Sequence, residues 1–381
     1  MEPRALVHRL VGSTETSTES ETIRLTRALR KDGSKPGELA QHCSVSRSTV
    51  YRQLDPLVDC GLLYRDEGKY SVTGGGELLL RDYDWAMETI GRDGLAYLAG
   101  STHRAGLLKA LNAEPLRSRE LVGDSVSKST VRRALRGFEE RDWVVRTTSG
   151  AYTTTSNGDE AIMTFLQLLE TAEQTQAKAP FLRRFGQRSL DIPRGILSES
   201  DLVVSTGQEP HAALNAVIDL TKLREAHQGT RKLRDVRTVV PIFSAVMYDV
   251  FGSLVDSGTQ MQIIFDQESY REMRTPGNAH YLAGAFLAPN LDVRIHPESL
   301  TFGFGYYDGA VMVAAYSERE DHDAGIVSED EQFAEWVVET IDDLWEEADS
   351  PTRYAVDGIR SALEDSELRS KLTELQDVVK R

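Results

Sequence analysis

An eleven-residue segment occurs twice in this chain, as SVSRSTVYRQL at residues 44–54 and as SVSKSTVRRAL at residues 125–135. The two versions differ only at positions 47/128, 51/132 and 53/134. Each has a serine able to cap a helix, followed by a valine and a leucine spaced to share one helix face. The repeat therefore predicts two helices with similar inward faces and different outward faces.

The segments flanking each version follow a common order. Apolar spacing and turn residues predict two helices before each repeated helix and two short strands after it. Around the first version, the predicted helices are 21–31 and a short one from Pro36, and the predicted strands are 62–65 and 69–72. Around the second version, the predicted helices are 101–112 and 119–123, and the predicted strands are 143–146 and 151–154. Helix, helix, turn, helix and two-stranded wing is the order of a winged helix-turn-helix, which the sequence predicts in tandem.

The second half of the chain has a different pattern. Strands alternate with helices from residue 202 onward, which predicts an α/β domain with a mainly parallel sheet and an antiparallel edge. Asp308-Gly309 predicts a tight hairpin, and Ser328 with Glu331 predicts a capping box at the start of a helix that reaches about Glu347. Leucines at positions 368, 372 and 375 predict a C-terminal amphipathic helix.

These patterns predict six segments. They are a flexible arm (1–20), a first winged helix-turn-helix (21–90), a second (95–158), a linker or dimer helix (159–180), an α/β effector-like domain (195–349) and a C-terminal helical extension (350–381).

The net charge of −16 is unevenly distributed. Residues 1–194 carry 28 Lys+Arg and 26 Asp+Glu, whereas residues 195–381 carry 16 and 34. Arg outnumbers Lys by 34 to 10, which together with abundant carboxylates favours a halophilic, haloarchaeal source. Concentrated salt removes most of the counterion-release contribution to DNA binding, so hydrogen bonds and packing must supply more of the affinity.

The remaining composition favours a cytoplasmic protein with reduced thiols. Only Cys43 and Cys60 are present, no apolar run is long enough to span a membrane, and no export signal is recognisable.

The outward faces of the repeated helices are the candidate DNA-binding surfaces. The second helix of a helix-turn-helix enters the major groove, where arginine can pair with guanine and hydroxyls can contact bases or phosphates. The candidates are Arg47, Ser48, Tyr51 and Arg52 in the first version, and Lys128, Ser129, Thr130, Arg132, Arg133 and Arg136 in the second. Arg65, Lys69 and Arg146 are candidates in the wings. The second version has more cations, so we expect it to bind DNA more strongly.

The second winged helix resembles that of archaeal, especially haloarchaeal, transcriptional regulators, through residues 101–104, 127–131 and 138–143. Residues 203–205, 209–214, 239–244 and 302–313 resemble the effector domain of the archaeal methanogenesis and filament-growth regulators. Such regulators commonly have one winged helix, whereas this chain has two. The resemblance implies a domain that senses a small molecule or a partner.

Three strand ends of the α/β half could bind such an effector, because α/β sheets often bind ligands where strands end and helices begin. The candidates are Glu209, His211, Phe243, Ser244 and Asp266. The alternative is that these are ordinary connections. No nucleophile-elbow, phosphate-loop, His-x-Lys or metal-ligand spacing occurs, so we expect no enzyme activity, metal or cofactor.

Together, these features predict a homodimeric, sequence-specific DNA-binding transcriptional regulator that responds to an effector. Its predicted partners are double-stranded DNA, a second copy of the chain and a small-molecule effector, with no membrane. The alternative is an interaction adaptor whose winged helices bind protein and leave no sequence-specific footprint on DNA.

Overall fold

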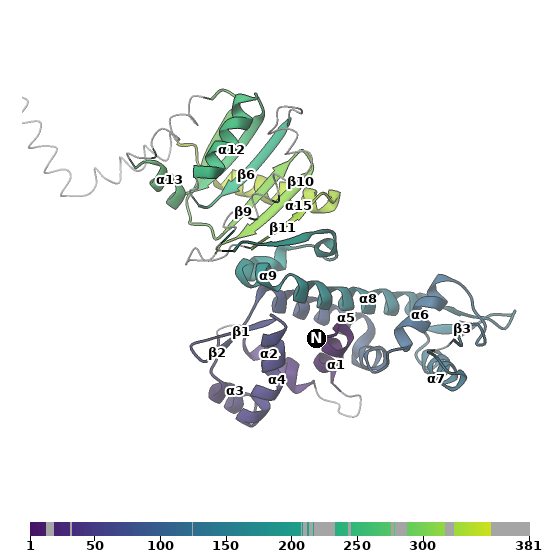
Figure 1. The fold of residues 1–381 in the computed structure, drawn as a ribbon. Helices are drawn as coiled ribbons and strands as arrows, with labels where there is room; N and C mark the ends of the chain where they lie inside the picture. Colours follow the sequence, from purple (N-terminus) through teal and green to yellow (C-terminus); the bar gives the residue numbers. More distant parts are fainter. Residues whose placement is uncertain are drawn as a thin grey trace, which may run out of the picture. The chain divides into compact units, whose positions relative to one another are not determined.

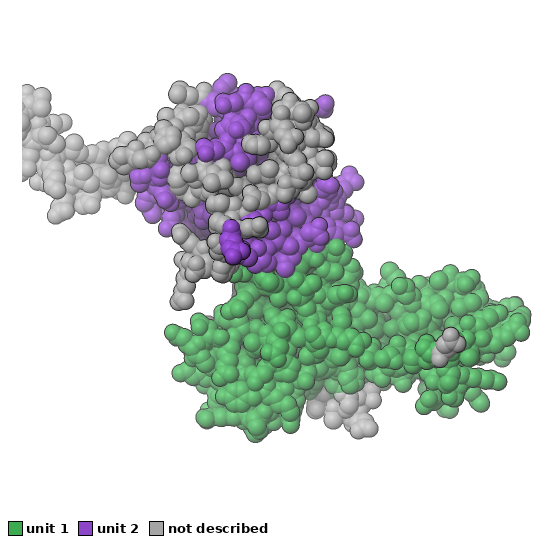
Figure 2. Space-filling view, in the orientation of Figure 1, with its two compact units in different colours: residues 1–198 green, residues 199–381 purple. Residues whose placement is uncertain are grey.

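The chain folds into two compact units, residues 1–198 and 199–381, seen in a computed structural model (Figures 1 and 2). The structure describes residues 1–12, 19–30, 33–123, 125–206, 208, 212, 216, 233–242, 245–275, 278, 288–316 and 324–351. Helix α1 (Pro3–Val11) buries Leu6, Val7, Leu10 and Val11 in the first unit. The prediction of a flexible arm over residues 1–20 is therefore wrong for α1, whose four apolar residues complete the core.

The first copy, residues 21–72, has the predicted element order. Helices α2 (Glu21–Ala28), α3 (Pro36–His42) and α4 (Arg47–Asp59) precede the antiparallel hairpin of β1 (Leu63–Asp66) and β2 (Lys69–Val72). The predicted inward face of α4, made by Val50, Leu54 and Leu57, is fully buried. Ser46 accepts a hydrogen bond from the backbone N–H of Thr49 at 3.1 Å, as expected of an N-cap.

The second copy, residues 104–154, repeats this order with one difference. It contains α6 (Arg104–Ala113), α7 (Lys128–Glu139), β3 (Val144–Arg146) and β4 (Tyr152–Thr154), and Val131, Leu135 and Phe138 are buried. Residues 118–121 form turns, so the short helix predicted over 119–123 is wrong. Leu116 pairs with Tyr152 and Gly123 with Val126, and this pairing holds the ends of the segment extended.

A long helix follows each hairpin, and both helices begin in the same way. Helix α5 spans Gly74–Ala99 and α8 spans Ser156–Ala177. Thr73 and Thr155 cap them, accepting from the N–H groups of Gly76 and Gly158 at 3.1 and 3.2 Å. A Cβ at Gly76 would lie 2.2 Å from the Leu62 carbonyl oxygen, and one at Gly158 2.0 Å from that of Trp143. Only glycine fits these two sites.

Helices α5 and α8 pack along each other and join the two copies (Figure 1). Their apolar residues belong to one continuous core that extends from α1 to α8. The interval between the predicted domains, residues 91–94, lies inside α5, which is broken at Gly91 with φ +67°. The linker helix predicted from residue 159 begins at Ser156.

A buried carboxylate fixes the last segment of the first unit to α5 and α8. This segment comprises α9 (Ala179–Phe185) and the 3-10 turns Gly186–Asp191 and Ile196–Glu199, the last of which ends at the first residue of the second unit. Asp82 on α5 is fully buried and accepts from Nε of Arg81 and of Arg194, each at 2.9 Å. Its other oxygen accepts from Thr171 of α8 at 2.6 Å.

The second unit is built on a seven-stranded mixed sheet in the order β5-β11-β10-β9-β6-β7-β8. The strands are β5 (Asp201–Val204), β6 (Asp235–Val240), β7 (Gln260–Asp266), β8 (Leu291–His296), β9 (Phe302–Tyr307), β10 (Ala310–Ala315) and β11 (Ala324–Ser328). Among the strands that the structure describes, only β6–β7 and β7–β8 pair in parallel; the other four pairs are antiparallel. The predicted mainly parallel sheet is therefore wrong, because the β9–β10 hairpin lies inside the sheet rather than at its edge and pairs antiparallel with β6 on one side and β11 on the other.

Three helices of this unit are described: α12 (Ala245–Asp256), α13 (Gln267–Met273) and α15 (Glu331–Glu347). The hairpin at Asp308-Gly309 is confirmed, with positive φ at both residues. Helix α15 ends where expected, but its cap is Asp330, which accepts from the Phe333 N–H at 2.9 Å, and Ser328 ends β11. The amphipathic helix predicted at the C-terminus lies outside the described residues.

Among the described residues, no helix is both long enough and apolar enough to cross a membrane.

Candidate nucleic-acid interface

Helix α7 presents an uninterrupted polar face. Ser127 caps the helix by accepting from the Thr130 N–H at 3.2 Å, and its hydroxyl also lies 2.9 Å from that of Ser129. Lys128, Ser129, Arg132, Arg133 and Arg136 are exposed as predicted, whereas Thr130 is half-buried.

Three of the cations on α7 have no partner within the described chain. Arg136 forms an ion pair with Glu140 one turn further along at 2.8 Å. No hydrogen bond or ion pair among the described residues involves the side chain of Lys128, Arg132 or Arg133. The start of α7 thus offers three cations whose hydrogen-bonding capacity is directed to solvent or to a ligand, beside the exposed hydroxyl of Ser129.

Tyr97, near the end of α5, positions α7. Its ring lies between the guanidinium groups of Arg104 and Arg141, 3.9 and 3.8 Å from the ring centroid. Its hydroxyl donates to the Ala134 carbonyl at 3.3 Å and occupies the space that a side chain at Gly137 would need. Burial raises the pKa of the Tyr97 phenol, so the donor stays protonated at neutral pH. Sequence reasoning missed this residue because its partners are distant in the chain.

The corresponding face of α4 is engaged by its own chain. Arg52 lies 3.7 Å from Glu21, and the Arg52 carbonyl accepts from Arg9 at 3.2 Å. The side chain of Gln53 accepts from Thr22 at 2.9 Å and from Arg9 at 3.2 Å, and it donates to Glu21 at 3.3 Å. Arg47, Ser48, Tyr51 and Arg52 are exposed as predicted, but Arg52 already has one carboxylate, that of Glu21, beside it.

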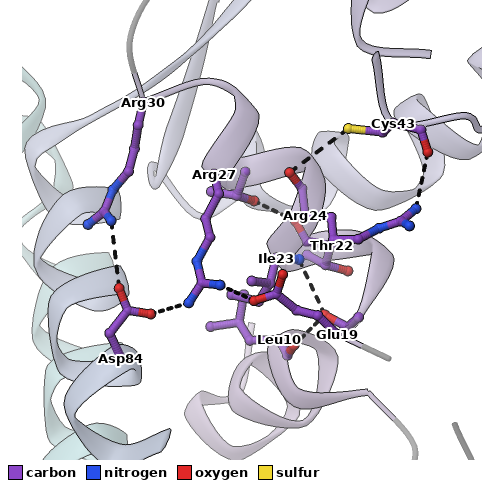
Figure 3. Close-up of polar contacts among 11 residues, drawn as sticks. Leu10, Glu19, Thr22, Ile23, Arg24, Arg27, Arg30, Cys43 and Asp84 are labelled. Atoms are coloured by element: carbon purple, nitrogen blue, oxygen red, sulfur yellow. Dashed lines mark hydrogen bonds and ion pairs between the residues drawn. The ribbon is translucent and has the colours of Figure 1, made fainter. Parts of the chain in front are cut away.

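Helix α2, which carries Glu21 and Thr22, is held in place by α5 (Figure 3). Arg27 forms an ion pair with Asp84 of α5 and with Glu19, and Arg30 lies 3.6 Å from Asp84. Arg30 also donates to Glu77 of α5 at 2.9 Å. These contacts fix the C-terminal end of α2, and at its other end, next to Glu21, Ser20 caps the helix by accepting from the Ile23 N–H at 3.2 Å.

Each of the two hairpins carries one arginine that is predicted from the sequence as a candidate for DNA contact. Arg65 of β1 lies over the ring of Tyr51 on α4, at 5.5 Å, and over that of Tyr70. Arg146 of β3 lies over Tyr152 at 5.9 Å and is exposed. The first hairpin arginine is therefore directed to its own helix α4, whereas Arg146 stays within its hairpin.

One effector candidate of the second unit can be placed. Asp266 is buried and caps α13, accepting from the Ser269 N–H at 2.8 Å through one oxygen and from the Leu300 N–H at 3.0 Å through the other. Both oxygens are thus used within the fold. Glu209, His211, Phe243 and Ser244 lie outside the described residues.

Comparison with known families finds matches in both halves of the chain. Residues 14–93 and again 92–177 match the HVO_A0261 N-terminal domain. Residues 221–347 match the middle domain of the methanogenesis regulatory protein FilR1. Two consecutive segments of the chain are therefore similar to the HVO_A0261 N-terminal domain, and a third segment is similar to the FilR1 middle domain. The resemblance to haloarchaeal and methanogenesis regulators expected from the sequence is confirmed, and each HVO_A0261-type domain contains one version of the repeated helix.

The solved structures similar to this chain are remote. TrmBL2, described as an archaeal chromatin protein, is 13% identical, with 65% of this chain and 94% of that chain covered and a TM-score of 0.30. Nuc, a phospholipase D family member from Salmonella typhimurium, is 12% identical over 40% of this chain and 98% of that one, with a TM-score of 0.29. Polyphosphate kinase from Porphyromonas gingivalis is 8% identical, covering 61% and 46%, with a TM-score of 0.28. Comparison with curated proteins finds no match.

Proposed function

We propose that this protein is a sequence-specific DNA-binding transcriptional regulator. Each HVO_A0261-type domain acts as a winged helix-turn-helix, with α4 or α7 as its recognition helix. The FilR1-type unit acts without catalysis, as a domain that senses an effector. The predicted homodimer stays a prediction, which sedimentation of the full chain tests.

The observation that carries the proposal is the start of α7. Lys128, Arg132 and Arg133 are exposed next to the Ser129 hydroxyl and are not engaged by the described chain. The N-terminal residues of a recognition helix meet base edges, and arginine can donate two hydrogen bonds to guanine. A helix with these side chains at its start has the chemistry required for reading the major groove.

The direct test selects DNA from a random pool with the full chain at molar salt, followed by footprinting. A defined protected sequence is expected. Arg132→Ala and Arg133→Ala should each weaken binding by about tenfold or more, since a good arginine–base pair contributes roughly 1–3 kcal/mol. Arg52→Ala should cost less, because Glu21 already competes for that guanidinium.

Lys109→Ala provides the matched control, since Lys109 is an exposed cation on α6 of the same copy. It should leave the footprint unchanged. A chain that selects no sequence and protects no site would be the interaction adaptor rather than a DNA-binding regulator.

A further inference from the structure

The two helices that join the copies are equivalent to each other. Thr73 and Thr155 cap α5 and α8 by the same hydrogen bond, to the third residue of the helix. That third residue is Gly76 or Gly158, and each packs on the backbone carbonyl just before its own hairpin. Both helices therefore leave their hairpins at the same place and by the same geometry.

These equivalent helices are also the ones that contact each other (Figure 1). Contact between equivalent surfaces characterises the two-fold interface of a symmetric dimer. Here both surfaces belong to one chain, and the apolar core is continuous across them, with Leu79 and Tyr83 from α5 and Phe165 and Leu168 from α8. The first unit thus has the organisation of a dimer formed within a single polypeptide.

Both recognition helices are carried by this pair. Figure 1 shows α4 and α7 toward opposite ends of the α5–α8 pair and on the same side of it. Dimeric helix-turn-helix proteins use two recognition helices, one from each chain, to reach successive major grooves about 34–36 Å apart. A second chain is not needed to supply the second helix.

The two helices are unequal readers. Arg132 and Arg133 on α7 are unengaged among the described residues, whereas Arg52 on α4 faces Glu21 and its neighbour Gln53 is held by Arg9 and Thr22. Identical recognition helices read palindromes, because the two half-sites mirror the symmetry of the protein. Two different helices require two different half-sites.

We propose that one chain occupies both halves of its DNA site, α7 in one and α4 in the other, and that this site is not a palindrome. The inference depends on the proposed function and adds the stoichiometry and symmetry of the complex. The α7 half carries most of the base recognition, and the α4 half adds affinity at a fixed spacing.

The test uses the full chain and the duplex obtained by selection, at concentrations well above the dissociation constant. Native mass spectrometry and titration should give one duplex per chain, whether or not the chains associate with each other. Hydroxyl-radical footprinting should show two protected patches about one helical turn apart. Tyr51→Ala combined with Arg52→Ala should remove one patch, and Arg132→Ala combined with Arg133→Ala should weaken the whole complex.

A five-base-pair insertion between the patches gives an independent readout that needs no variant protein. It rotates one half-site to the opposite face of the duplex, so affinity should fall at least tenfold, to that of a single half-site. One duplex per two chains, with a single patch per chain or a palindromic selected site, would overturn the inference and leave the proposed function intact. Absence of any specific footprint would overturn the proposed function and the inference together.

Discussion

The Nε atom of Arg194 lies 2.9 Å from the buried carboxylate of Asp82, and this contact fixes the segment that ends the first unit to helix α5. Arg81 strengthens the attachment by donating to the carbonyls of Leu190 and Ile192, at 3.1 and 2.7 Å. The segment that leads to β5 is therefore bound to the helix that joins the two copies.

Replacing Asp82 tests this attachment. Asp82→Ala should lower the free energy of unfolding by about 2–4 kcal/mol, because it leaves two arginines and the Thr171 hydroxyl without their buried acceptor. Chemical denaturation measures the loss, and hydrogen exchange should rise over residues 186–198. Asp191→Ala removes an exposed carboxylate from the same segment and should change neither value. Equal effects of the two substitutions would contradict the role given to Asp82.

Gly158→Ala tests the close approach at the start of α8. The added Cβ would lie 2.0 Å from the Trp143 carbonyl oxygen, so the helix must move away from its hairpin. We expect a loss of about 1–3 kcal/mol in stability, seen as a lower melting temperature. Gly106→Ala is the control, since that glycine is exposed within α6 and has open space around it, and alanine there should be neutral or slightly stabilising. A Gly158→Ala protein as stable as the wild type would refute the tight packing.

Glu21→Gln should increase DNA binding by the first copy. It removes the negative charge beside Arg52 and leaves a side chain that can still contact Gln53. Because exposed ion pairs contribute up to about 1 kcal/mol, the gain should be roughly two- to fivefold in affinity at moderate salt. Asp59→Asn makes the same charge change at the exposed end of α4 and should give a smaller effect. Unchanged or weaker binding by Glu21→Gln would show that Glu21 does not restrain Arg52.

Alkaline stability should depend on Tyr83. Burial raises the pKa of its phenol to about 12, above the value near 10 of an unfolded chain. Between these values the native state keeps a proton that the unfolded state has lost, so stability falls as the pH rises from about 10 to 12. Tyr83→Phe should make the unfolding free energy less dependent on pH in that window. A slope equal to that of the wild type would exclude Tyr83 as its source.

The sequence predicts the two repeated helices, α4 and α7, well because their register is local. A serine cap and a Val–Leu spacing of four residues determine which face of α4 or α7 is buried, and all six predicted inward residues are buried. The asymmetry between the copies could be predicted only in part. The excess of cations on α7 is visible in the sequence, but the contacts of Arg52 and Gln53 with Arg9, Glu21 and Thr22 depend on packing between distant segments.

Helix α5 is not predicted from the sequence, because its start also depends on packing against distant segments. Three consecutive glycines are poor helix formers, yet Gly74, Gly75 and Gly76 form its first turn. A Cβ at Gly74 would lie 2.1 Å from the Ser189 hydroxyl and 2.5 Å from the Leu182 carbonyl oxygen. The close approach of remote backbone overrides local propensity. The mixed sheet escaped prediction because two of its antiparallel pairs, β5 with β11 and β6 with β9, join strands that are distant in the sequence.

The break of α5 at Gly91 means that a single residue, rather than a tether, separates the helix that ends the first copy from the helix that leads into the second. When two binding surfaces are joined by a long flexible linker, binding of the second surface costs conformational entropy of the linker. The effective concentration of the second surface therefore falls as the linker lengthens. In this chain the connection is already ordered in the folded state, so little of that entropy is left to lose on binding. If both copies bind DNA as proposed, they act as one bivalent ligand, and lengthening the joint at Gly91 should lower the affinity for the whole site without changing the affinity of either copy for its half.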